Sequence, residues 1–349
     1  MLFNHFLSAY YPDTSYGGHR LFRDMIAQGI LADQLGYSAV TIPEHHLINI
    51  LLTPSPLQMA VRVAAETRNI DLVTSVSVLP IHDMRIFAGE VSQADNLTDG
   101  RLVLGVGRGA FRYELERLGV DMEQTREIFD ESLMVLEELL TKEEASWDGT
   151  HYQFEQLTIM PRPYTKPMPR IMIAALAPTA LYHCARRGFN VQTTVLQHDR
   201  NHLLEQVQGF QTGKAERSDQ SVDIKLSMLQ VGYLAKDQAD ADEKIDLAHD
   251  YYKRFDNVFT GPGIVSRGAI EPLPRQQTRD ELAANLLICT RDEMIDRLSY
   301  YKEAGIDEIT LNPNIGASQD EVLEQMNRMA AEVFPALSAQ RQKTGSVVV

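Results

Sequence analysis

Residues 100–109 read GRLVLGVGRG, and this run decides the fold class. Its first part is an apolar stretch of strand type, and its second part is a glycine-rich turn that carries Arg108. A strand that ends in such a turn before a helical segment is typical of a βα unit in a parallel sheet. The same alternation between strand and helix periodicity continues along the chain in both directions.

Eight βα units are predicted from this alternation. Helical periodicity is expected in residues 19–35, 57–67, 86–97, 125–140 and 179–187. Strands are expected in residues 2–9, 38–42, 71–79, 101–106, 170–174, 191–196, 225–234 and 308–312. Residues 147–170 contain four prolines and predict an irregular excursion or a small hairpin.

A closed barrel explains eight similar units better than an open sheet does. A doubly wound sheet is the competing architecture, but no GxGxxG follows the first strand. The predicted fold is therefore an α/β protein of the (β/α)8 TIM-barrel class, forming one domain over residues 1–337. Residues 254–282, rich in Gly, Pro and Arg, are expected to form a long mobile loop after strand 7 that acts as a lid, and residues 338–349 a flexible tail.

The composition excludes several classes of function. The formal net charge of −15 opposes nucleic-acid and anionic-membrane partners, because the field of the molecule repels phosphate. The two cysteines, Cys184 and Cys289, lie far apart and predict neither a disulfide framework nor a zinc site. No stretch is apolar for long enough to cross a membrane, so a soluble cytoplasmic protein is expected.

Residues 41–46, TIPEHH, end the second predicted strand. In a barrel, the carboxyl ends of the strands hold the chemistry. Successive strand residues point to opposite faces, so one of His45 and His46 is expected to be catalytic and the other structural. The histidine spacing differs from that of a helical zinc motif, so no metal site is predicted, and a surface histidine pair stays an alternative.

Two turns predict a site for an anion. Because the protein as a whole is acidic and repels phosphate, a phosphorylated cofactor would need such a local site. Arg108 is placed at a strand end, where a guanidinium can bind phosphate with two hydrogen bonds. Residues 174–180, AALAPTA, place small side chains before a helix start, where free N–H groups attract anions. A solvent-exposed arginine and ordinary helix capping are the alternatives.

Two further features predict a site with a planar ring and an oriented histidine. Thr74, Ser75 and Val76 belong to a strand whose small hydroxyl residues leave room for a ring beside the backbone. Glu114, six residues after Arg108, could hydrogen-bond a histidine ring and fix its tautomer. Taken alone, Glu114 is more often a solvated residue at a helix start.

The order and spacing of these motifs resemble the bacterial-luciferase-like monooxygenases. The resemblance covers most of the chain, up to the segment Gly305-Ile306-Asp307-Glu308, and fades in residues 254–282, where that family has its variable mobile loop. Two departures, Leu176 and Ala177, stand where the luciferase pattern has an acidic residue and a serine.

The resemblance implies bound FMN and assigns a role to each motif. His45 resembles the catalytic histidine and Glu114 its acidic partner. Arg108 looks like the arginine that contacts the flavin phosphate. The remaining cofactor contacts implied are Ala177, Thr179 and Ala180 at the phosphate, and Thr74, Ser75 and Val76 against the ring, where the family often has a non-prolyl cis peptide.

The resemblance also implies a two-component system. A separate NAD(P)H:flavin reductase would supply reduced FMN, which reacts with O2 through a C4a-(hydro)peroxyflavin to oxygenate a small molecule, and His45 would manage proton transfer. No NAD(P)H fingerprint is present, which agrees with this arrangement. Family members commonly form homodimers. The sequence also looks like the branch that opens N-heterocyclic rings, such as the pyridinium ring of trigonelline.

Substrate contacts are expected from aromatic residues at strand ends and from cations in or near the loop. An aromatic wall with a cation-bearing lid suits a small planar acid. The candidates are Tyr10, Tyr11, Tyr113, His198, Arg254 and Arg267, with surface or packing roles as the alternative for each.

Two rival functions remain open from the sequence. An F420-dependent oxidoreductase would share the barrel and also place a histidine near the ring. A non-catalytic flavin-binding barrel is the second rival, but it would give His45 and Glu114 no reason to lie together.

Overall fold

Eight parallel strands close into a barrel, so the predicted fold class is confirmed. The computed structural model describes residues 1–195 and 200–337. β14 pairs with β1 and with β10, and β10 also pairs with β9, which joins the two ends of the sheet. In order around the barrel the strands are β1 (Leu2–Phe6), β2 (Ala39–Ile42), β3 (Asp71–Thr74), β5 (Leu102–Gly107), β8 (Arg170–Ala174), β9 (Asn190–Thr193), β10 (Leu226–Leu234) and β14 (Glu308–Asn312).

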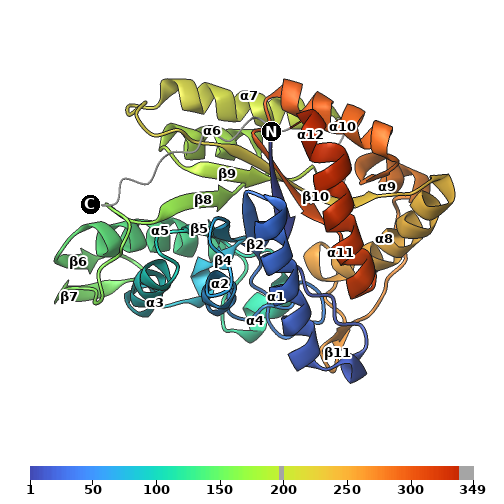
Figure 1. Ribbon diagram of the computed structural model, residues 1–349. Coiled ribbons are helices and arrows are strands. Elements are labelled where there is room, and N and C mark those ends of the chain that lie inside the picture. The colour runs from blue at the N-terminus through green and yellow to red at the C-terminus, as the bar shows by residue number, and fades with distance from the viewer. Residues whose placement is uncertain (196–199, 338–349) are drawn as a thin grey trace.

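The helices pack around the outside of the barrel (Figure 1). Each buries one face, as in α1 (Gly18–Leu35), which buries Leu21, Met25 and Ala32 and ends at Gly36 with a φ of 81°. The other surrounding helices are α2 (Pro56–Ala64), α3 (Met84–Leu97), α5 (Thr125–Thr141), α6 (Pro178–Arg186), α7 (Arg200–Glu216), α8 (Gln238–Phe259), α10 (Arg291–Ala304) and α11 (Gln319–Arg328). Short helical segments complete the set: η1 (Thr14–Tyr16), η2 (Leu79–Ile81), α4 (Arg112–Arg117), α9 (Arg279–Asn285), η3 (Met329–Val333) and α12 (Phe334–Leu337).

Alternation along the strands separates the inside of the barrel from its outside. Val40, Leu72 and Leu104 belong to the large outer core beneath the helices. A separate inner layer is formed by Ala39, Val73, Val103 and Met172.

The predicted strand 71–79 is interrupted at its carboxyl end. It is split into β3 and β4 (Ser77–Val78), and the Ser75–Val76 peptide between them is cis, as the resemblance implied. β5 must approach this segment closely. A Cβ on Gly105 would lie 1.7 Å from the Thr74 carbonyl oxygen, and one on Gly107 would lie 2.5 Å from Cγ2 of Val76. The glycines of the GRLVLGVGRG run therefore allow the two strand ends to meet.

The proline-rich excursion contains a hairpin, one of the two forms predicted. β6 (Ala145–Asp148) and β7 (Gln153–Leu157) pair antiparallel and lie near α3 and α5 at the lower left of Figure 1. The Glu131 carboxylate of α5 accepts bonds from the Trp147 indole at 3.0 Å and from the His151 and Tyr152 N–H groups at 2.9 and 3.1 Å. One buried carboxylate thus attaches the hairpin to the barrel.

The prediction of a continuous loop over residues 254–282 is wrong at both ends. α8 continues to Phe259, and α9 begins at Arg279 with a capping box from Thr278. Between the helices lies the two-stranded pair β11 (Val265–Ser266) and β12 (Ala269–Ile270). After α9, a strand that was not predicted, β13 (Leu287–Cys289), pairs with the end of β10. The residues Gly261-Pro262-Gly263 made the whole segment look like a loop, but they end α8 only after its aromatic residues.

Asn257, in the last turn of α8, fixes this inserted segment to the helix. Its amide nitrogen donates to the carbonyl oxygens of Ile264 and Glu271 at 2.9 and 2.7 Å, and its amide oxygen accepts from the Ile264 N–H at 2.9 Å. The Asn49 amide oxygen also accepts from the Ile270 N–H at 3.1 Å, so the inserted segment is attached both to α8 and to the turn after β2.

Two further predictions concern the C-terminal tail and membrane-spanning helices. The predicted tail 338–349 lies outside the described residues. In the described part of the chain, no helix combines the length and apolar character that a bilayer crossing requires.

Candidate active site

The carboxyl ends of the barrel strands open into a cavity of about 910 Å³. Residues that follow or end seven of the eight barrel strands line it, from Pro43 after β2 to Asn312 at the end of β14. This is the end of a barrel where active sites lie. The volume is near the upper limit of roughly 300–1,000 Å³ for small-molecule sites, so it suits a cofactor and a smaller molecule together.

His45 and Glu114 form a pair at this cavity, as the sequence predicted. His45 Nδ1 lies 2.7 Å from Glu114 Oε2, and the other carboxylate oxygen accepts the His46 backbone N–H. The His45 ring stacks on Phe111 with 4.3 Å between centroids and 22° between planes. Among the described residues none bonds to His45 Nε2, so the carboxylate and the stacked ring fix the imidazole and leave one nitrogen for a ligand.

The ring of His46 belongs to a different cluster, centred on Glu44. The Glu44 carboxylate, whose side chain is fully buried, accepts from His46 Nε2 at 3.1 Å, from His82 Nε2 at 2.8 Å and from the Val78 N–H at 2.7 Å. Burial alone would raise the pKa of Glu44, but these bonds outweigh it and hold the pKa below its ordinary value. The bond to Glu44 raises the pKa of His46.

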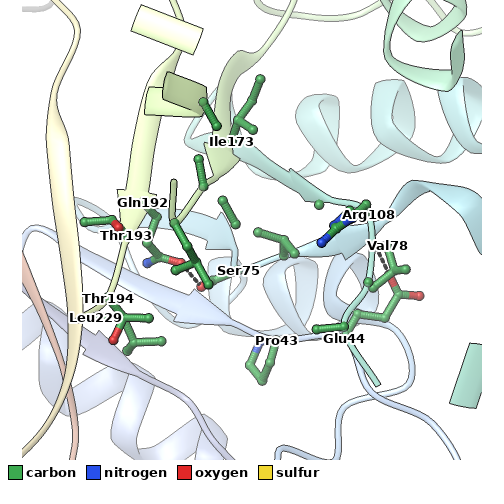
Figure 2. Close-up of a pocket in the computed structure, with 18 of the residues that line it drawn as sticks. Pro43, Glu44, Ser75, Val78, Arg108, Ile173, Gln192, Thr193, Thr194 and Leu229 are labelled. Carbon is green, nitrogen blue, oxygen red and sulfur yellow. Dashed lines mark hydrogen bonds between the residues drawn. The ribbon is translucent and has the colours of Figure 1, made fainter. Parts of the chain in front are cut away.

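The two histidine rings therefore have different surroundings. His45 lines the cavity, whereas the His46 ring is bound to Glu44. Glu44 also connects the histidine turn to Val78 in β4, directly after the cis peptide, and Figure 2 shows this contact beside Arg108. The sequence did not reveal Glu44, because nothing in its spacing from His82 marks the contact.

The residues predicted to bind an anion line the same cavity. Arg108 is exposed and has no ion pair or hydrogen bond with the described residues. Ala177, Thr179 and Ala180 line the cavity at the start of α6, whose first turn has no side-chain cap. A free guanidinium and an uncapped helix start therefore open on one space, which suits a phosphate.

Arg126 is an addition that the sequence analysis missed. It is exposed, lines the cavity and has no ion-pair partner in the described part of the chain, whereas the neighbouring Arg187 is 2.6 Å from Glu137. Arg126 also stands in the first turn of α5, where the helix dipole disfavours a cation. An arginine in that unfavourable place is the signal that could have identified it.

The floor of the cavity holds polar atoms without partners. The Ser75 hydroxyl donates to Gln192 Oε1 at 2.5 Å, as Figure 2 shows, and Val76 lines the cavity beside it. The other amide atom, Gln192 Nε2, and the Thr193 hydroxyl are buried and make no hydrogen bond in the structure. Thr74 lies deeper, where its hydroxyl donates to the Gly105 carbonyl at 2.7 Å, and it does not line the cavity.

The proposed substrate contacts lie elsewhere. Tyr10 packs edge-on against Tyr251 behind the cavity wall, and the Tyr11 hydroxyl donates to the Thr14 carbonyl. Arg254 is paired with Asp250. Two more expected contacts are turned away: Tyr113 lies beneath Arg117, and Arg267 is exposed in the turn between β11 and β12.

None of these five residues lines the cavity, and His198 falls outside the described residues. The expected wall of strand-end tyrosines is replaced by aromatic residues of α8 and by Phe111. The cause is the wrong assignment of residues 254–259 to a loop, which hid the last turns of that helix.

Comparisons with known proteins agree with this geometry. The chain is 28% identical over 328 residues to the oxygenase component of a flavin-dependent trigonelline monooxygenase from Acinetobacter baylyi, covering 91% of each chain. The oxygenating constituent of 3,6-diketocamphane monooxygenase from Pseudomonas putida, solved in complex with FMN, has a TM-score of 0.78 at 16% identity, covering 97% of this chain and 99% of the other. An F420-dependent secondary alcohol dehydrogenase has a TM-score of 0.75 at 16% identity, with the same two coverages.

The structural likenesses, at this identity, describe the barrel. The family is decided by the sequence itself: residues 1–331 match the family model described as luciferase-like monooxygenase, which spans the histidine turn, the glycine-rich strand and the last barrel strand. The chain therefore belongs to the luciferase-like monooxygenase family.

Proposed function

We propose that this enzyme uses reduced FMN and O2 to oxygenate a small organic substrate. The observation that carries the proposal is the His45–Glu114 pair, 2.7 Å apart, at a cavity that the unpaired Arg108 also lines. One group can move a proton and the other can bind an anion, so one end of a cofactor can be anchored while the other reacts.

The residues present fit FMN. Its phosphate suits Arg108, Arg126 and the uncapped start of α6 with Thr179. The polar edge of its ring suits Gln192 Nε2 and the Thr193 hydroxyl, the two buried groups that lack partners. When bound in its reduced form, FMN supplies the electrons that activate O2.

His45 is the residue proposed to handle protons. Glu114 holds Nδ1, so Nε2 is the atom that gives or takes a proton at the ligand. Phe111 on the ring face prevents the imidazole from rotating away. Because Glu114 is buried and also accepts the His46 N–H, its own position is fixed by the turn that it orients.

Three finer points complete the proposal, and the first two rest on a relative. The first is that a separate NAD(P)H:flavin reductase supplies the reduced flavin, since the Acinetobacter relative is named as an oxygenase component. The second is that the substrate carries a pyridine-type ring that the reaction opens, since that relative is named for trigonelline. The third is a single barrel domain over residues 1–337.

The test is an anaerobic titration with reduced FMN, followed by oxygenation with a library of N-heterocycles and detection of added oxygen by mass. Binding of reduced FMN and a product with one added oxygen atom are the expected results. Tight binding of F420 and none of FMN would favour the F420-dependent rival instead. Flavin binding without product for any ring would favour a non-catalytic flavin protein.

We also propose a homodimer through an apolar surface on α3, made of Ile86, Leu97, Met160 and Tyr164, which are 54–73% exposed. The segment with Met160 and Tyr164 is attached to α3 by an Asn96 Nδ2 bond of 3.0 Å to the Arg162 carbonyl. Replacing Ile86 and Met160 with glutamate is expected to convert a dimer into a monomer in sedimentation, with the circular dichroism unchanged. Dimers that persist in the variant would place the interface elsewhere.

A further inference from the structure

The last turns of α8 present an aromatic face to the cavity. Tyr251, Phe255 and Phe259 are four residues apart, so they share one side of the helix, and Tyr252 is adjacent. All four line the cavity. Their rings contact one another, with centroids 5.3 Å apart for Phe255 and Phe259 and 5.7 Å apart for Tyr252 and Phe255.

This aromatic face is continuous with the proposed catalytic histidine. Phe111, which stacks on His45, meets Phe255 edge-on at 5.7 Å and Phe259 at 6.2 Å. A flat ring bound against α8 therefore lies beside the His45 imidazole. Arg108 and Arg126, proposed to bind the phosphate, come from the turn after β5 and from α5, so the three elements meet in one cavity, and Phe111, three residues after Arg108, connects the α8 rings to that turn.

Tyr251 adds a single polar group to this wall. The residue is 3% exposed, and its hydroxyl has no hydrogen bond to any of the described residues. Burial raises the pKa of the phenol far above its ordinary value, so it remains a neutral donor. A buried tyrosine hydroxyl in a folded protein normally has a partner, and here the open cavity is the place from which a ligand can supply it.

The wall carries no charge of its own. The cavity residues that come from β10, α8 and β14 include no acidic or basic side chain within the described ranges. The Arg275 guanidinium lies against the Tyr252 ring, 5.0 Å from its centroid, and its Nε is 3.3 Å from the Asp256 carboxylate. An anionic ring would be desolvated here without a cation to meet it.

We infer that the face formed by Phe111, Tyr251, Tyr252, Phe255 and Phe259 is the substrate subsite, and that it takes a planar aromatic or heteroaromatic ring without net negative charge, whose one hydrogen-bond acceptor is bound by the Tyr251 hydroxyl. The inference rests on the proposed function, because it assigns a substrate to the same cavity. It also replaces the small planar acid that strand-end tyrosines and loop arginines would have selected.

The test compares the affinities of four small probes by calorimetry. Each is measured with the protein saturated with oxidised FMN and again without flavin. Benzamide is planar, neutral and has an acceptor; benzoate is its anion; cyclohexanecarboxamide is not planar; toluene lacks the acceptor. Benzamide is expected to bind at least about 10-fold more tightly than benzoate and cyclohexanecarboxamide. Equal binding of benzoate and benzamide would overturn the inference.

Tyr251→Phe tests the hydroxyl. It is expected to weaken benzamide about 5- to 10-fold, the effect of one neutral hydrogen bond, and to leave toluene unchanged. Tyr10→Phe is the matched control, since the Tyr10 ring packs against the Tyr251 ring with 5.4 Å between centroids and does not line the cavity. It should leave the affinities for all four probes unchanged. Equal losses for benzamide in the two variants would contradict the role of Tyr251.

The two proposals fail in different ways. Binding of reduced FMN, measured in the anaerobic titration, tests the cofactor alone. If FMN binds and the four probes are not distinguished, the subsite is wrong and the proposed cofactor stands. If FMN does not bind, the proposed function is wrong, and the probes measured without flavin still decide the subsite.

Discussion

The two ends of the cavity are built from opposite materials. The end at β5, α5 and α6 has exposed arginines, alanines and an uncapped helix start, whereas the end at α8 has buried and half-buried aromatic rings and a phenol, Tyr251, that has no hydrogen bond to the described residues. Charged groups in contact with water release an anion readily, whereas buried rings exclude water and select by shape. We infer from this difference that one end of the cavity anchors a ligand and the other selects it by shape, and that His45 acts in the same cavity.

The largest expected effect on activity comes from His45, the residue proposed to transfer a proton. His45→Ala is expected to reduce product formation about 10²- to 10⁴-fold, because proton transfer at Nε2 is lost. The affinity for FMN should remain, since both ends of the cavity are intact. Single-turnover product yield and flavin fluorescence measure the two properties, and unchanged turnover would remove His45 from the mechanism.

The next effect separates the charged end from the aromatic end. Arg108→Ala is expected to weaken FMN about 10- to 100-fold, the contribution of a charge-assisted bond of about 1.5–3 kcal/mol, and to leave riboflavin, which lacks the phosphate, almost unchanged. Arg187→Ala is the matched control, because this cavity arginine is already paired with Glu137. Equal losses for FMN and riboflavin would show that Arg108 does not meet the phosphate.

The smallest effect concerns the support of the site. Glu44→Gln is expected to lower the free energy of unfolding by about 1–3 kcal/mol, because three donors lose a buried carboxylate. The Glu44 pKa is lowered by folding, so its contribution is present above its unfolded pKa and lost as pH falls. The His46 pKa is raised, so that contribution is present below its unfolded pKa and lost as pH rises.

The difference in melting temperature between the original protein and Glu44→Gln should therefore be greatest between about pH 4.5 and pH 6.5 and decrease on both sides. Thermal unfolding at several pH values measures it. A difference that does not vary with pH would mean that Glu44 acts through packing alone.

Periodicity was sufficient to predict the barrel, and the family resemblance was needed to choose Glu114 as the partner of His45. The last strand, Glu308–Asn312, has the bounds that its pattern predicts, since its residues EITLN alternate between polar and apolar side chains with the period of a strand. Glu114 and His45 are 69 positions apart, yet both follow barrel strands, and strand ends meet at one rim.

The substrate wall was not predictable in the same way. The Tyr251, Phe255 and Phe259 stripe belongs to a helix that is polar elsewhere and is followed by glycine and proline, so local composition favoured a loop. Glu44 was missed for a different reason: its contact with His82 depends on how two barrel turns pack, and no local pattern encodes that.

Asn257 has a consequence for engineering. Three bonds of this amide, together with the bond from the Ile270 N–H to the Asn49 amide oxygen, hold residues 260–271 in place, so this segment forms a cassette whose ends are defined by chemistry. Grafts from related enzymes that keep asparagine at positions 49 and 257 should dock without disturbing Phe255 or Phe259, so the segment is exchangeable independently of the aromatic wall. Chimeras cut inside α8 would alter both at once.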